Sequence, residues 1–325
     1  MSTIGVNSYT LADWAKRLDP NGKVDKVVEL MAQTNEVLQD MMYVEGNLPT
    51  GHRTTVRTGL PSVAWRKLNY GVQPSKSTTK QVDDQCGMLE AYCQVDKKLC
   101  ELNGHKASFR LSEDRPFIEA MNQEFATTLF YGDTDLEPEK FLGLAPRYPY
   151  SDSPNVVDFG DAGDNCTSIW LVVWGDNTVH GTFPKGSKGG VSHQDLGEVT
   201  LEDDAGGLFQ GFRTHYKWEP GLVVRDWRYV VRVCNIDTTD FTSDQVIKAM
   251  ITAMHKVPSL KMGNPCWYMN KTMITALDIE AAYKSNVFFK VSEDPGGEMT
   301  THFRKIPIRQ VDAILDTESA LTATP

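Results

Sequence analysis

The chain has 325 residues, of which 40% are hydrophobic and 23% are charged, with 25 glycines and 16 prolines. This composition is typical of a folded globular protein and excludes a disordered chain, a collagen and a coiled coil. The formal net charge of −10 disfavours general binding to nucleic-acid phosphates. The chain has no run of 18 apolar residues and no basic-then-apolar start, so we expect a soluble intracellular protein without a membrane partner.

The N-terminal residues predict a helical arm over 1–45. A turn at 19–22 precedes apolar residues that recur at helical spacing from Val24 to Met42. Such spacing is typical of an amphipathic helix.

The next segment, residues 46–82, carries six basic residues and no Asp or Glu, so the rest of the chain carries −16. It is rich in strand formers and is punctuated by Gly59, Pro61, Gly71 and Pro74, a pattern that predicts a long β-hairpin. The segment has too few aliphatic residues to bury a face of its own. Because isolated hairpins are marginal in water, we expect this one to lie on another surface.

Residues 83–104 predict a strand followed by a short helix. A longer helix is expected from its N-cap Ser112 to Gly132, with Ile118, Met121, Phe125 and Leu129 on one face. An acidic, loop-like stretch follows up to residue 163. We expect strands at 167–174, 178–183, 222–236, 265–269, 286–291, 302–308 and 310–315, helices at 243–258 and 271–285, and surface loops at 185–207. The fold class is α+β, because strands and helices do not alternate regularly.

Motifs for catalysis or cofactor binding are weak throughout. The glycine-rich run 185–190 lacks the spacing of a phosphate-binding loop, and neither GxGxxG nor GxSxG occurs. His180, His193 and His215 could form a metal site, and Asp158, Asp161 and Asp164 a weak ion site, but scattered histidines and solvated carboxylates are the simpler interpretation. The six cysteines are interpreted as reduced thiols, with Cys86, Cys93 and Cys100 as small buried hydrophobes. The sequence therefore predicts no enzyme and no cofactor.

The split of charge has two possible explanations. The aromatic residues Trp65 and Tyr70 beside Arg66 and Lys67 could stack on nucleic-acid bases. The acidity of the rest of the chain opposes that contact. A basic hairpin that docks on an acidic neighbour of the same kind explains both halves of the split.

The order of features is similar to that of a known family. Residues 59–84 resemble a two-stranded extended loop, residues 92–104 and 109–133 resemble the approach to a long spine helix, and 141–148 resemble the short segment after it. Further on, 264–279 and 303–315 resemble an axial strand and helix and the closing strands. The chain thus resembles the major capsid proteins of tailed double-stranded DNA bacteriophages, which have the Hong Kong 97 fold, and most closely those of short-tailed phages.

This resemblance implies a structural subunit whose copies form hexamers and pentamers of an icosahedral shell around packaged DNA. It implies an N-terminal arm (1–45), an extended loop (46–82), a peripheral domain (83–165) with a spine helix at about 112–131, a mixed region with the axial domain (166–300), and closing strands with a tail (301–325). The extended loop would contact a neighbouring subunit through Arg53, Arg57, Trp65, Arg66, Lys67, Tyr70 and Lys76. The acidic counter-surface would comprise Asp133, Asp135, Glu137, Glu139, Asp158 and Asp161.

The resemblance also implies partners and a location. We expect a separate scaffolding protein, because the arm begins almost at the first residue, together with a portal and a possible decoration protein. DNA would be enclosed without sequence-specific binding, in a virion capsid assembled in the host bacterial cytoplasm. Some relatives join subunits covalently; Lys67, Lys76 and Lys80 lie on the right element, but no Asn or Glu partner is identified, so no cross-link is assigned.

Two alternatives stay open. The first is an encapsulin-type nanocompartment shell with an enzyme cargo, which gene neighbourhood would distinguish from a phage. The second is a metal- or thiol-dependent enzyme built on a mixed β domain, which metal content and mutation of every Cys and His would test.

Overall fold

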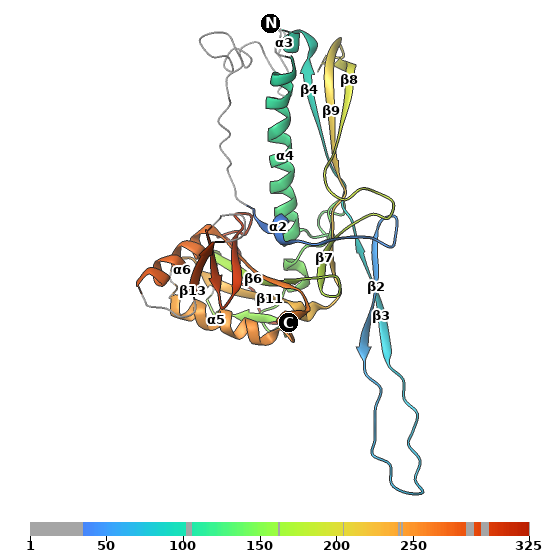
Figure 1. The fold of residues 1–325 in the computed structure, drawn as a ribbon, viewed down its shortest axis with the longest axis vertical. Coiled ribbons are helices and arrows are strands. Elements are labelled where there is room, and N and C mark those ends of the chain that lie inside the picture. Colours follow the sequence, from blue (N-terminus) through green and yellow to red (C-terminus); the bar gives the residue numbers. More distant parts are fainter. Residues whose placement is uncertain are drawn as a thin grey trace. The chain divides into compact units, whose positions relative to one another are not determined.

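The computed structural model describes residues 35–101, 106–161, 163–203, 205–239, 241, 243–283, 289–293 and 299–324 (Figure 1). The chain divides into two compact units. The first comprises Met88–Phe125 and Lys188–Glu219, and the second comprises Asn35–Gly87, Ala126–Ser187 and Pro220–Pro325. Both contain strands and helices without regular alternation, which confirms the α+β class.

The first unit is an antiparallel sheet in the order β4-β9-β8, with helix α3 and much of helix α4. The Phe125 ring of α4 stacks on Trp218 of β9 with 4.5 Å between ring centroids, and Phe117 stacks on Tyr216 at 6.0 Å. These aromatic pairs form the core between helix and sheet. The elements are β4 (Leu89–Asp96), α3 (Lys97–Glu101), α4 (Lys106–Tyr131), β8 (Ser192–Glu202) and β9 (Leu208–Trp218).

Helix α4 differs from the helix predicted from Ser112. It begins at Lys106, so the predicted N-cap and Pro116 both lie inside it. Residues 106–111 are mostly good helix formers, and they extend the helix beyond the capping pattern. Met121, Phe125 and Leu129 are buried as expected, but Ile118 is 49% exposed. At that level the contact with the sheet is made by the preceding residue, Phe117.

Strand β8 corrects the prediction of surface loops at 185–207. Its residues alternate little between polar and apolar, and most are exposed. The strand forms because its backbone pairs with β9 from Ser192↔Lys217 to Glu202↔Leu208. Backbone pairing with a neighbour, rather than burial of an apolar face, defines this strand, so its polar sequence gave little indication of it.

The second unit is built on a ten-stranded mixed sheet in the order β1-β7-β6-β12-β15-β14-β13, with β10 paired to β7, and with β5 paired to β11, which pairs with β6. All nine residues of β6 are buried, since this apolar strand lies between β11 and β12. The strands are β1 (Tyr43–Glu45), β5 (Val156–Asp158), β6 (Cys166–Trp174), β7 (Val179–Phe183), β10 (Gly221–Val224), β11 (Val230–Asp237), β12 (Asn264–Met269), β13 (Phe289–Glu293), β14 (Met299–Phe303) and β15 (Ile306–Gln310).

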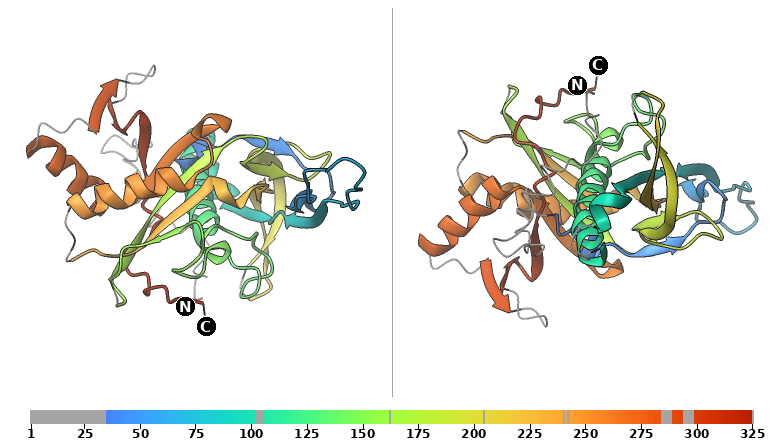
Figure 2. Two further views of the ribbon diagram at one scale, coloured as in Figure 1. Left: turned by 90° about the horizontal axis from the view of Figure 1, so that it is seen from below. Right: turned by 90° about the horizontal axis from the view of Figure 1, so that it is seen from above.

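Two helices pack beside this sheet, α5 on β11 and β5 and α6 near β15, both in orange in Figure 2. Val246, Met250 and Ala253 of α5 are fully buried, at the helical spacing that the sequence showed. The helices are α2 (Val37–Asp40), α5 (Ser243–Lys256) and α6 (Lys271–Tyr283), with 3₁₀ turns at Ala145–Arg147, Trp227–Tyr229 and Leu260–Met262.

Several predicted elements of this unit differ in extent. The strand expected at 302–308 divides into β14 and β15, because Arg304 and Lys305 form a turn with positive φ between them. Of the helix expected over 24–42, the described residues form only α2, Met41 is already extended, and residues 24–34 lie outside the described part. The strand expected at 222–236 divides into β10 and β11, because the Asp226 side chain accepts from the Arg228 amide and turns the chain. The strand expected at 310–315 is a turn after β15, where the Ile314 amide donates to the Val311 carbonyl at 3.2 Å.

Strands β2 (Gly51–Gly59) and β3 (Thr78–Gln85) form a separate two-stranded antiparallel sheet within the second unit. The pairing runs from Gly51↔Gln85 to Gly59↔Thr78. Residues 60–77 join the strands without helix or strand structure and are drawn as the long loop below β2 and β3 in Figure 1. We call residues 60–77 the hairpin tip.

Candidate functional site

The hairpin tip carries several large apolar side chains that are exposed within one short segment. Trp65 is fully exposed and Val63 is 91% exposed. The other large apolar side chains of the tip are also exposed: Leu60, Leu68, Tyr70 and Val72. Exposed apolar side chains gathered in one short segment make the hairpin tip a candidate interaction site.

The basic residues of the hairpin divide into two groups. Arg53 forms a two-bond ion pair with Asp83, with both nitrogen–oxygen distances at 2.6 Å, because the register places these residues opposite each other. Its charge is thus balanced within the hairpin, which weakens its predicted role in a contact between subunits. The other cations form no ion pair with any described residue: Arg57, Arg66, Lys67, Lys76 and Lys80.

The base of the hairpin is anchored by a buried ion pair. Arg147 donates to the Asp84 carboxylate at 2.7 Å and also to the carbonyls of Leu142 and Leu222. Asp83 and Asp84 directly follow the acid-free segment 46–82. They lie on β3 at the base of the hairpin, where antiparallel pairing places them opposite residues of β2. Basic residues therefore stand without acidic neighbours at the tip of the hairpin, whereas acidic residues accompany them at its base.

A pair of buried histidines lies beside this anchor. The rings of His52 on β2 and His180 on β7 meet edge to face, with centroids 5.7 Å apart. Arg225 donates from Nη2 to His52 Nε2 at 3.1 Å. Neither ring nitrogen of His180 has a partner among the described residues. Burial, with smaller contributions from Arg225 and His52, lowers the pKa of His180 from 6.5 to about 4.

This lowered pKa predicts a pH dependence of stability. In the unfolded chain the imidazole binds a proton near pH 6.5, but in the folded chain it does so only near pH 4, so stability falls as the pH drops through this window. The full effect is roughly 3 kcal/mol. We expect His180→Leu to unfold with a shallower dependence on pH between these values, measured by urea titration at several pH values. His255→Gln, an exposed position on α5, is the control and should keep the wild-type slope. An unchanged slope in His180→Leu would contradict this assignment.

The two predicted acidic clusters differ in whether their carboxylates are free to contact a neighbouring copy. The Asp158 carboxylate accepts hydrogen bonds from the Asn235 side chain and from the Gly160 amide, and the Asp161 carboxylate accepts one from the Asp237 amide. These carboxylates are therefore engaged within their own subunit. In residues 133–139, by contrast, several acidic side chains are exposed beside Leu136, which is 81% exposed. The exposed acidic side chains of that stretch are Asp135, Glu137 and Glu139, of which Glu137 pairs with Lys140.

The candidate metal ligands do not come together. His180 contacts His52, whereas His215 stacks on Tyr92 and pairs with Glu90, and His193 lies beside Tyr216. Across the described residues no group of three or more His, Cys, Asp or Glu side chains could hold a metal ion.

The cysteines are free thiols, and five of the six are buried. Burial raises the pKa of Cys93, Cys234 and Cys266 to about 12, so these thiols stay protonated and unreactive at neutral pH. No helix in the described ranges is long and apolar enough to cross a membrane.

Comparisons with solved structures and with protein families show which class of protein has this fold. A chain in a structure of bacteriophage Epsilon15 shares 35% sequence identity with this chain over 99% of this chain and 100% of the other, with a TM-score of 0.77. The bacteriophage JBD30 capsid shares the fold, with a TM-score of 0.52 at 9% identity over 88% of this chain and 93% of the other. An encapsulin complex from Synechococcus elongatus PCC 7942 reaches a TM-score of 0.46 at 12% identity, over 72% of this chain and 99% of the other. Comparison with curated proteins gives no match.

Residues 19–322 match the family described as Major capsid protein GP7, and the chain belongs to this family. It is a major capsid protein of tailed phages, so many copies of it form a shell and it is part of the virion. The predicted family and fold are thereby confirmed. The family match and the Epsilon15 structure support the phage capsid, and the encapsulin alternative is less supported.

Proposed function

We propose that the hairpin tip of each copy lies on an adjacent copy, and that the copies form the hexamers and pentamers of an icosahedral shell around packaged DNA. The observation that carries this proposal is the tip itself, where six large apolar side chains are exposed and none of the residues 60–77 is buried. Apolar surface of this extent favours burial against a second surface. Membership of a capsid family supports a second copy as that surface.

Charge adds specificity to this contact. The tip presents Arg66, Lys67 and Lys76 without ion-pair partners among the described residues, while the chain as a whole is acidic. A single exposed ion pair contributes only about 0 to 1 kcal/mol, so the charges mainly orient the contact and the apolar side chains supply most of the affinity. Repetition at every subunit makes a weak contact sufficient for a stable shell.

The finer assignments belong to the same proposal. Residues 46–82 act as the extended loop, α4 as the spine helix, and 1–45 as an arm on a neighbour. The subunit is structural and catalyses no reaction, as membership of a capsid family supports. Family membership supports a scaffolding protein, a portal and a decoration protein as partners, and assembly in the cytoplasm of the bacterial host. The net charge of −10 supports enclosure of DNA without sequence-specific binding.

Reversal of the unpaired cations tests the proposal. We expect Arg66→Glu, Lys67→Glu and Lys76→Glu together to abolish shell formation, while the isolated subunit unfolds at the wild-type urea concentration. Arg53 is left unchanged, because its reversal would also break the pair with Asp83. The measurements are sedimentation velocity and negative-stain electron microscopy.

The matched control reverses three exposed lysines outside the hairpin, Lys185, Lys188 and Lys261. This control changes the net charge equally and should assemble. Normal particles from the hairpin variant would refute the proposal.

A further inference from the structure

We propose that a groove along β2 at the base of the hairpin is the docking site for the acidic loop, residues 133–139, of a second copy. The inference rests on the proposed contact between copies and assigns a second contact, distinct from that of the tip. The groove, here called the basic groove, has a volume of about 860 Å³. It is lined by residues 52–60 of β2 and beyond, by Asn47 and Asn177, and by the turn 225–228.

The lining of the basic groove is strongly cationic. Four arginines line it against a single acidic residue, Asp226. Arg228 pairs with Asp226 at 2.7 Å and Arg53 pairs with Asp83, but Arg57 pairs with no described residue. Arg225 approaches Asp176 only to 3.7 Å. The groove thus keeps an excess of positive charge after its internal pairs are formed, which favours an anionic occupant.

Buried donors in the groove wall lack acceptors. His52 is 7% exposed and lines the groove. Because a guanidinium has no acceptor, the bond with Arg225 makes His52 Nε2 the acceptor, and the neutral ring carries its proton on Nδ1. Nδ1 and Arg225 Nε are both buried without a partner among the described residues. Both donors are covered in the isolated subunit, so a carboxylate of a second copy would first meet the exposed guanidiniums of Arg57 and Arg228.

The acidic loop matches this groove in chemistry. It exposes the carboxylates of Asp135 and Glu139 on either side of Leu136, which is 81% exposed. The groove offers an apolar counterpart in Trp227, which is 47% exposed in its wall. Two exposed carboxylates beside an exposed leucine therefore match a wall that combines an exposed indole ring with an excess of arginines.

Within one copy no residue of the acidic loop lines the basic groove, so we place the loop of a second copy in it. The Gly143 amide donates to the Gly132 carbonyl at 2.7 Å and closes the base of the loop. Its far end meets the chain just beyond β3, where the Glu139 carbonyl oxygen would lie 3.3 Å from a Cβ atom at Gly87. The groove follows β2 instead. Two different complementary surfaces on one chain form a head-to-tail interface, which closes into rings such as hexamers and pentamers.

Cross-linking of mixed subunits tests the contact directly. Chains carrying Thr55→Cys and chains carrying Leu136→Cys are tagged differently, co-assembled and oxidised with copper phenanthroline. Thr55 is an exposed residue of the groove. We expect disulfide-linked heterodimers at least tenfold above the background of shells without introduced cysteines. The control mixes Lys76→Cys, at the tip, with Leu136→Cys and should stay at background.

The outcomes separate this inference from the proposed function. Two results would overturn the docking site and leave the tip contact standing: normal shells without a heterodimer between Thr55→Cys and Leu136→Cys chains, or normal shells in which only the Lys76→Cys chain cross-links to the Leu136→Cys chain. A complete failure of the wild-type chain to form shells would overturn the proposed function instead. A charge exchange provides a second readout if a cysteine variant does not fold: Arg57→Glu should lower the shell yield, and adding Asp135→Lys and Glu139→Lys should restore it. Failure of that restoration in a folded variant would also overturn the docking site.

Discussion

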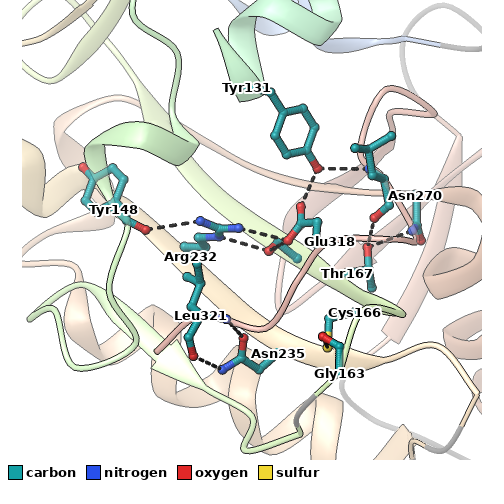
Figure 3. Close-up of polar contacts among 12 residues, drawn as sticks. Tyr131, Tyr148, Gly163, Cys166, Thr167, Arg232, Asn235, Asn270, Glu318 and Leu321 are labelled. Atoms are coloured by element: carbon teal, nitrogen blue, oxygen red, sulfur yellow. Dashed lines mark hydrogen bonds and ion pairs between the residues drawn. The ribbon is translucent and has the colours of Figure 1, made fainter. Parts of the chain in front are cut away.

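Replacement of Glu318 by glutamine is expected to lower the free energy of unfolding of the subunit by about 3 to 5 kcal/mol. Glu318 lies in the C-terminal segment, and its side chain is buried together with that of Arg232 on β11. Arg232 donates to its carboxylate at 2.9 Å. Figure 3 shows the two side chains facing each other between β6, β11 and the C-terminal segment.

The carboxylate is held by more than its ion pair. Ser168 donates to the oxygen that Arg232 binds, and the Tyr131 hydroxyl at the end of α4 donates to the other oxygen. Tyr131 also accepts from the Leu315 amide at 3.0 Å, and Arg232 donates to the Tyr148 carbonyl at 3.2 Å (Figure 3). One carboxylate therefore joins the long helix, the central sheet and the C-terminal segment.

Glutamine keeps the size of the side chain but removes its charge, so Arg232 is left buried without a counter-charge. The measurement is urea unfolding of the unassembled subunit, followed by circular dichroism. The control Glu198→Gln breaks the exposed pair with Lys97, and it should cost less than about 1 kcal/mol. Replacing both partners, as Arg232→Met with Glu318→Leu, should recover much of the loss, because no unpaired charge remains. A Glu318→Gln subunit as stable as the Glu198→Gln control would contradict this account.

In this network the strand could be predicted from the sequence, but the ion pair could not. The strand around Val230–Asp237 could be predicted, because it is an apolar run of β-branched residues. The partner of its central arginine lies 86 residues further along, in a polar tail that gives no periodic pattern. Local pattern indicates many of the strands and helices, whereas the pairing of distant charges depends on a tertiary structure that no local pattern encodes.

For the candidate site as well, the element could be predicted from the sequence but one of its side-chain pairs was missed. The acid-free segment 46–82 predicted a basic hairpin, and the unpaired cations of its tip agree with that. Arg53 differs because its partner, Asp83, lies one residue beyond the segment, and antiparallel pairing brings the two together. A search for cross-strand partners of each basic residue would have found this pair. The basic groove could not have been predicted, because its walls come from residues 47–60 and from residues 177–228, which are far apart in the sequence.

Shortening of the hairpin is expected to separate folding from assembly completely. In this variant residues 60–77 are replaced by Asn-Gly, a dipeptide that closes two antiparallel strands in a tight turn. No residue of the tip is buried, and its described hydrogen bonds are local, such as Ser75 to the Ser62 carbonyl at 2.7 Å. Its removal therefore takes no packing from the subunit, and the urea midpoint should stay at the wild-type value.

Assembly should be lost, because the exposed apolar side chains that the tip would bury on a neighbour are absent. We expect subunits or small oligomers by sedimentation velocity and no shells by electron microscopy. A second variant replaces residues 60–77 with a Gly/Ser loop of equal length and should fail in the same way, which assigns the effect to side chains rather than to loop length. Shells of wild-type size from the Asn-Gly variant would mean that contacts elsewhere, such as the basic groove, suffice to hold neighbouring copies together. A normal Gly/Ser variant beside a failed Asn-Gly variant would instead mean that the reach of the loop, and not its apolar surface, holds the shell.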